Sequence, residues 1–125
     1  MSLHTFEDLE VWKRASRLAV DVYVATYQSN DFGLKNQMQR AAVSIPSNIA
    51  EGAERDSAGD FIRFLRIAKG SCAELRTQLY INQKASQELA ISPFNNIDQL
   101  VRETKEIASM LHGLIQSVQK NNTSK

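Results

Sequence analysis

Apolar residues recur three and four positions apart along the second half of the chain, the spacing of an amphipathic α-helix. One stripe lies between residues 93 and about 120, and another between 58 and about 87. The later stripe consists of Ile97, Leu100, Thr104, Ile107, Leu111, Leu114 and Val118. The earlier stripe consists of Phe61, Leu65, Ala68, Cys72, Leu75 and Leu79. Such stripes are typical of helices that pack in a bundle.

Capping and helix-breaking residues predict two more helices in the first half. The first begins near Thr5, whose spacing to Asp8 is that of a capping box, and runs to about residue 28. The segment 29–33 is polar and contains glycine, so it breaks this helix. A second helix then covers about 34–53, with a proline inside it.

Two further capping signals set the starts of the later helices. Ser57 has Asp60 three positions on, which predicts the beginning of the third helix. Ser92 precedes Pro93, and proline is favoured at the first position of a helix, so this pair predicts the beginning of the fourth. The polar residues 121–125 are expected to form a loose tail.

The length of 125 residues suits one domain, which we assign to residues 1–120. Glycine and proline are scarce, and no window alternates as a strand would. Short connections favour antiparallel neighbours. The predicted fold is therefore all-α, an antiparallel up-down-up-down four-helix bundle.

The first helix carries a wider apolar arc than a monomeric bundle needs. Its apolar and small residues spread over roughly 200°. An apolar face that the monomer does not cover needs a partner or risks aggregation. We therefore predict a homo-oligomer interface that includes Trp12 and Tyr23. The alternative is that both rings pack at the edge of the monomer core.

A polar seam follows the second helix around Pro46. At about 100° per residue, the members of the seam fall on one line. They are Gln37, Arg40, Ser44, Asn48, Glu51 and Arg55. Pro46 cannot donate a hydrogen bond, so the carbonyl of Ala42 loses its helical partner, and Ser44, Ser47 and Asn48 are placed to compensate. Two interpretations stay open: a kinked core helix with a structural seam, or a binding site built on the seam.

Arg40 and Glu74 stand beside the small residues Ala41 and Ala73, where a charge on a packed helix face would need a partner. We interpret Glu74 as part of the same structural seam, with Arg40 and Glu74 pairing with each other or with Glu51. Loss of one partner of a buried pair costs about 3–5 kcal/mol. The functional alternative makes Arg40 a phosphate ligand and Glu51 or Glu74 a general acid or base, but the sequence offers no nucleophile, metal cluster or glycine-rich loop to go with them.

The overall charge is nearly balanced, with 15 basic and 14 acidic residues and a pI of about 7.9. Nucleic-acid binding would therefore have to come from a local pattern. One flank of the third helix supplies such a pattern. It carries Arg66, Lys69, Arg76 and Lys84, with Ile62 and Tyr80 interleaved. This row is a candidate for binding phosphates. A solvated helix face has the same appearance.

Several kinds of chemistry find no support in the sequence. Cys72 is a single cysteine on an apolar stripe, which indicates a core residue rather than a nucleophile. His4 and His112 are far apart and lack cysteine partners, so no zinc site and no other metal site is expected. We find no catalytic constellation, cofactor motif or small-molecule site. Neither a signal peptide nor a membrane span is evident, and a cytoplasmic protein is expected.

Motifs in the middle of the chain resemble those of a bacterial four-helix bundle family encoded by intervening sequences in 23S ribosomal RNA genes. The matching motifs are RAA at 40–42, SIP at 44–46, NIAEG at 48–52, FIRFL at 61–65, AKGSCAEL at 68–75 and, upstream, FEDLEVW at 6–12. The chain is also similar to the accessory protein of diversity-generating retroelements. Two positions depart from the family pattern, Gln39 and Lys35.

The resemblance implies a small helical bundle that forms a homo-pentamer and has a nucleic-acid role. Together with the residue pattern, it predicts a non-enzymatic oligomer with RNA or another nucleic acid as its partner. The alternative is a protein-interaction scaffold or accessory subunit that does not contact nucleic acid, and a hydrolase is a distant third. A continuous basic face would favour the first interpretation, and an apolar groove the second.

Overall fold

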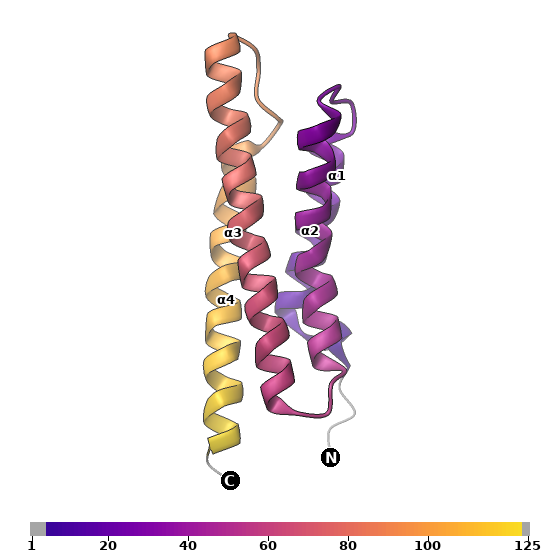
Figure 1. Ribbon diagram of the computed structural model, residues 1–125, viewed down its shortest axis with the longest axis vertical. Helices are drawn as coiled ribbons and strands as arrows, with labels where there is room; N and C mark the ends of the chain where they lie inside the picture. The colour runs from indigo at the N-terminus through magenta and orange to yellow at the C-terminus, as the bar shows by residue number, and fades with distance from the viewer. Residues whose placement is uncertain (1–4, 124–125) are drawn as a thin grey trace.

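A computed structural model describes residues 5–123 of the chain. These residues form a short 3-10 turn and four α-helices. The turn is η1 (Phe6–Asp8), and the helices are α1 (Glu10–Thr26), α2 (Phe32–Ala53), α3 (Ala58–Leu89) and α4 (Ile97–Thr123). Neighbouring helices run antiparallel, with α1 and α2 as a shorter pair beside the long pair α3 and α4 (Figure 1). The predicted all-α four-helix bundle is confirmed.

The first helix was predicted to begin near Thr5, five residues before α1 begins at Glu10. Thr5 and Asp8 do interact, since the backbone N–H of Thr5 donates to the Asp8 carboxylate at 3.4 Å. The pair closes η1 rather than α1, because Leu9 is extended, with φ of −74° and ψ of 123°, and separates the turn from the helix. The end of α1 at Thr26 lies within two residues of the prediction.

Asp31 caps the second helix, so α2 begins at Phe32 and not at Leu34. The Leu34 N–H donates to Asp31 Oδ1 at 3.2 Å. Pro46 is buried within α2, and the helix continues through it. Asn48 was expected to bond the Ala42 carbonyl, which lacks its helical partner because of Pro46. Instead, Asn48 Nδ2 donates to the Ser44 carbonyl at 2.8 Å.

Ser57 caps α3 as predicted, accepting the Asp60 N–H at 3.1 Å. The predicted cap of α4 at Ser92 and Pro93 is wrong, because α4 begins at Ile97. Tertiary contacts hold the connection in another path: the Phe94 N–H donates to Asn82 Oδ1 at 3.0 Å, and the Phe94 ring packs against the core.

The far end of α4 also differs from the prediction. The helix continues to Thr123, three residues beyond the expected end at Lys120, so Asn121 and Asn122 are helical and not a loose tail. The rest of the predicted tail, 124–125, and the N-terminal residues 1–4 with His4 lie outside the described residues.

The two apolar stripes form part of a core to which all four helices contribute. Leu65, Ala68, Cys72, Leu75 and Leu79 of α3 are buried against the stripe of α4. Burial raises the pKa of the Cys72 thiol to about 12, which opposes formation of a thiolate and fits a packing role.

Gly52 allows α2 and α3 to approach closely at their connection. A Cβ at this position would lie 2.7 Å from the Phe64 Cβ and 3.2 Å from the Phe61 carbonyl oxygen. Any larger residue would therefore force the two helices apart.

Candidate nucleic-acid interface

The half-buried part of the polar seam is a hydrogen-bonded link between α2 and α3. Ser44 Oγ and Ser71 Oγ lie 2.9 Å apart, and Asn48 Nδ2 donates to Ser44 Oγ at 2.9 Å. Ser71 was not among the seam residues expected from the sequence. Because these polar groups bond one another, this part of the seam joins α2 to α3. Gln37, at the far end of the predicted line, is exposed.

The predicted burial of Arg40, Glu51 and Glu74 is wrong, because all three side chains are exposed. Ala41 and Ala42 take the inward positions of this turn of α2, which leaves Arg40 outside. Glu51 forms an i,i+4 ion pair with Arg55 at 2.9 Å. Within the described residues no ion pair joins Arg40 to Glu74 or to Glu51.

The basic flank of α3, defined as Arg66, Lys69, Arg76 and Lys84, reaches the surface. Arg66, Lys69 and Lys84 are exposed and Arg76 is half-buried. At about 100° per residue the four lie within an arc of about 80°. Lys84 lies 3.7 Å from the Glu88 carboxylate, whereas the other three form no ion pair with any described residue.

Arg40 stands apart from this flank. It lines a hollow of about 500 Å³ together with Tyr23, Asn36, Gln39, Val43 and Ser44, on the side of the bundle where α1 and α2 meet. Arg40, the alternative phosphate ligand, therefore does not extend the basic flank of α3.

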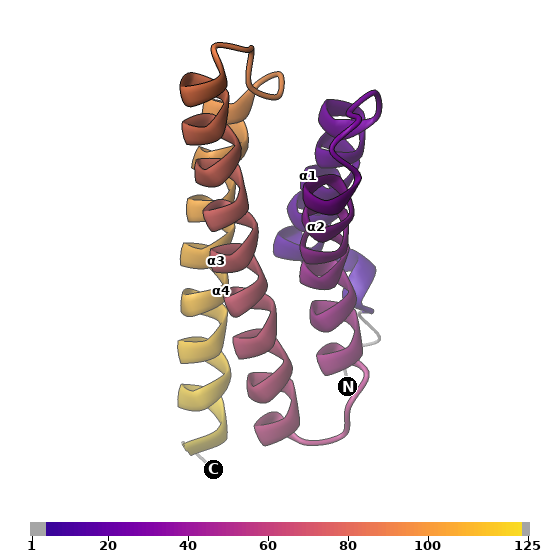
Figure 2. The ribbon, with the colours of Figure 1, turned by 45° about the horizontal axis from the view of Figure 1, so that its top comes forward.

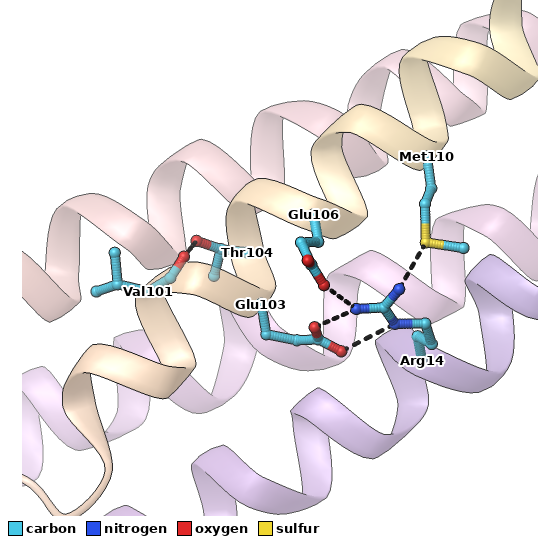
Figure 3. A network of polar contacts seen from close by, with 6 residues as sticks. All are labelled: Arg14, Val101, Glu103, Thr104, Glu106 and Met110. Carbon is cyan, nitrogen blue, oxygen red and sulfur yellow. Dashed lines mark hydrogen bonds and ion pairs between the residues drawn. The ribbon is translucent and has the colours of Figure 1, made fainter.

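Acidic side chains of α4 are held on the side of α4 that faces α1 (Figure 3). The Arg14 guanidinium donates to both oxygens of Glu103, at 2.5 and 3.1 Å, and also to Glu106 and to the sulfur of Met110. The hydrogen bond from Arg14 lowers the pKa of the Glu106 carboxyl. This cluster was missed because the partners are 89 or more residues apart in sequence.

The two aromatic residues predicted for an oligomer interface lie in different surroundings. Trp12 is half-buried, packs against the core and meets the Phe6 ring edge-on at 5.2 Å. Tyr23 is 47% exposed. Its exposed apolar neighbours are Val20 and Val24 on α1 and Tyr27 directly after the helix, and we name these four residues the α1 apolar surface.

A hollow of about 790 Å³ opens at the end of the bundle where both helical pairs turn. It is lined from both connections, by apolar side chains such as Val24, Tyr27, Leu89 and Ile91, with Asp31 as the only charged residue in its lining. The α1–α2 and α3–α4 pairs diverge towards this end (Figure 2).

Two further observations concern the described residues alone. No three His, Cys, Asp or Glu side chains among residues 5–123 come together as a metal site would require. None of the helices in this part of the chain has an apolar stretch that could span a bilayer.

The sequence model of one protein family matches residues 7–113, which include α1, α2, α3 and most of α4. Its description is 23S rRNA-intervening sequence protein. The chain belongs to this family. The match confirms the resemblance that the motifs between residues 6 and 75 indicate, and it takes in every residue of the basic flank. A search among curated proteins finds no significant match.

Proposed function

We propose that this member of the 23S rRNA-intervening sequence protein family is a non-enzymatic helical bundle that binds RNA through phosphate contacts on the basic flank of α3. One observation carries the proposal: Arg66, Lys69 and Arg76 share one side of α3, and none is in an ion pair with a described residue. Cations without protein partners are available to phosphates, and phosphate contacts provide affinity without reading sequence.

The acidic cluster around Arg14 supports this proposal. If the side chains of Glu103 and Glu106 pointed towards α3, they would bring negative charge close to the basic flank. Their bonds to Arg14 hold them towards α1 instead, away from the basic flank. These two carboxylates therefore do not offset the cations of the basic flank, although the whole chain has a net charge of only +1.

We further propose that the chain self-associates through the α1 apolar surface, and that the assembly is a pentamer, as the resemblance implies. Tyr23 and Val20 are each 47% exposed and Val24 and Tyr27 are each 72% exposed, which is costly for four large apolar side chains on a lone monomer. The surface belongs to α1, whereas the basic flank belongs to α3. Repetition of the flank in an oligomer would add avidity to individually weak contacts.

A titration of labelled structured RNA with the full chain at low salt tests the binding proposal. The matched pair of variants is Arg66→Gln, Lys69→Gln and Arg76→Gln together, and Lys13→Gln, Arg17→Gln and Arg40→Gln together. Both remove three positive charges from largely exposed positions. We expect the first variant to bind RNA much more weakly than the parent and the second to bind like the parent. Equal weakening in both would show that only net charge matters and would contradict a site on α3.

A protein-binding role is the second candidate, and the hollow of about 790 Å³ favours it. Its apolar lining and single charged residue suit the apolar face of a partner helix. If the parent binds no RNA at low salt, and Leu89→Asp abolishes the binding of a protein that co-purifies with the parent, this scaffold function replaces the RNA-binding proposal.

A further inference from the structure

A hydrogen bond marks where the outer edges of α3 and α4 meet. Gln83 Nε2 donates to Asp98 Oδ1 at 3.2 Å. Residues seven apart occupy nearly the same angular position on a helix, with a drift of about 20°. Because the two helices are antiparallel, the residue seven before Gln83 faces the residue seven after Asp98. These residues are Arg76 and Lys105, so two cations lie opposite each other across the α3–α4 seam.

One heptad further, the same register sets Lys69 opposite His112. Lys69, Lys105 and His112 are exposed, and Arg76 is half-buried. We name these four residues the cationic ladder, after the charges of Lys69, Arg76 and Lys105. Its two rungs are separated by about 10.5 Å, seven residues of helix. Arg102 lies three residues from Lys105 and is also exposed.

Like charges that face each other across a helix seam, here Arg76 and Lys105, destabilise the fold unless an anion lies between them. Within the described residues none of the four ladder residues is in an ion pair, and Asp98 accepts from Gln83 at one end of the seam. The nearby carboxylates of α4, Glu103 and Glu106, bond to Arg14 on the other side of that helix. An anion that neutralises the ladder would therefore have to come from another molecule.

We infer that the cationic ladder binds the sugar–phosphate backbone of an RNA duplex along the α3–α4 seam. This inference rests on the proposed function and names the ligand of that surface. It also extends the surface to α4, where the sequence pattern had not placed any binding residue.

A duplex fits this face better than a single strand does. Proteins that bind single strands stack the bases on several exposed aromatic side chains. Among the described residues, the face of α3 and α4 beside the ladder carries one exposed aromatic side chain, Tyr80, which is 44% exposed. The two long helices hold their cations at fixed spacings. A duplex also holds its phosphates in fixed positions, so it suits this face better than a flexible single strand.

The width of the face favours RNA over DNA. Helix axes that pack together lie about 8–10 Å apart, and each helix with its side chains is about 10–12 Å across, so the pair presents a face of about 20 Å. The major groove of B-form DNA is about 12 Å wide and admits one helix. The minor groove of A-form RNA is wide and shallow, and proteins contact its backbone without entering deeply.

Fluorescence anisotropy with the full chain in its native assembly tests the inference. The probes are an RNA duplex longer than the ~16 base pairs that a double-stranded-RNA domain covers, one strand of that duplex, and the DNA duplex of the same sequence. The ladder variant carries Arg76→Gln and Lys105→Gln. The control variant carries Lys13→Gln and Arg17→Gln, which remove the same charge from α1.

We expect the parent to bind the RNA duplex about tenfold more tightly than either other probe, and the ladder variant to lose about tenfold in duplex affinity while the control keeps it. Without RNA, the ladder variant should unfold at the same or a higher temperature at low salt, because a repulsion is removed. Tighter binding of the single strand would overturn the inference and leave the proposed function standing, whereas equal weakening in the control would contradict both, because it would show that only net charge matters. Absence of any RNA binding by the parent would instead refute the proposed function. A clear loss of stability in the ladder variant would show a structural pair and also overturn the inference.

Discussion

Arg14 on α1 and Glu103 on α4 are joined by two hydrogen bonds between their charged groups, Nε to Oε2 at 3.1 Å and Nη2 to Oε1 at 2.5 Å (Figure 3). The pair connects the first helix to the last, and Glu106 adds a third contact to the same guanidinium. A forked, partly buried ion pair has a more fixed geometry than a surface pair. It therefore contributes to the fold and also determines where the negative charge of α4 lies.

Replacing Arg14 by alanine should lower the free energy of unfolding by about 1–2 kcal/mol. The side chains of Arg14 and Glu103 are 34% and 27% exposed, so solvent screening keeps the effect below that of a fully buried pair. Arg17→Ala is the control, because its i,i+4 pair with Asp21 is exposed and worth about 0.3–0.5 kcal/mol. Urea unfolding of both variants measures the difference, and equal effects would contradict a special role for Arg14.

The stabilisation from Arg14 should depend on pH in the acidic range. The bond from Arg14 lowers the pKa of Glu106 below the unfolded value of about 4.3. A carboxyl whose pKa is depressed by folding stabilises the protein above the unfolded pKa, and this stabilisation is lost as the pH falls through the folded pKa. The difference in melting temperature between the parent and Arg14→Gln should thus be constant from about pH 7 to 5 and shrink by about pH 3. A difference that grows towards acid would contradict this assignment.

The half-buried seam residues and the exposed ones should respond differently to mutation. Asn48→Ala removes the bonds to the Ser44 carbonyl and hydroxyl, so we expect a loss of about 1–2 kcal/mol in unfolding free energy. Arg40→Ala removes an exposed side chain and should change stability by no more than about 0.5 kcal/mol. Thermal unfolding of both variants compares the two. A large loss for Arg40→Ala would restore the buried interpretation that the sequence favoured.

Charge on the α1 apolar surface should dissociate the oligomer without unfolding the bundle. Tyr23→Glu places a carboxylate on a residue that is already 47% exposed, so the monomer has little to lose. Light scattering should report an assembly for the parent, with five subunits expected, and a smaller species for the variant. Lys13→Glu on the same helix is the control. A parent that is monomeric at micromolar concentration would refute self-association.

The fold could be predicted because core positions repeat with a helical period. The stripe from Leu65 to Leu79 packs where its spacing requires, and the cap at Ser57 is local, so both were found from sequence. The start of α4 was not found, because Asn82, twelve residues before Phe94, holds that connection in place of a cap at Ser92. Local signals are reliable only where no tertiary contact competes with them.

The candidate site could be predicted only in part, for a similar reason. A row on one helix, such as Arg66, Lys69 and Arg76, follows from the helical period alone. The period does not tell which neighbour each flank faces, so it could not show that Arg40 lies where α1 and α2 meet. The contribution of Lys105 needs the register between α3 and α4, which the bond from Gln83 to Asp98 provides.

The salt dependence of RNA affinity tests the central claim most directly. If Arg66, Lys69 and Arg76 contact phosphates, the logarithm of the association constant of the parent should fall steeply and linearly with the logarithm of salt concentration. The variant with all three changed to glutamine should bind more weakly at low salt, with a slope reduced by about one for each phosphate that it no longer binds. A parent that binds no RNA at low salt, or a variant with the affinity and slope of the parent, would contradict the account.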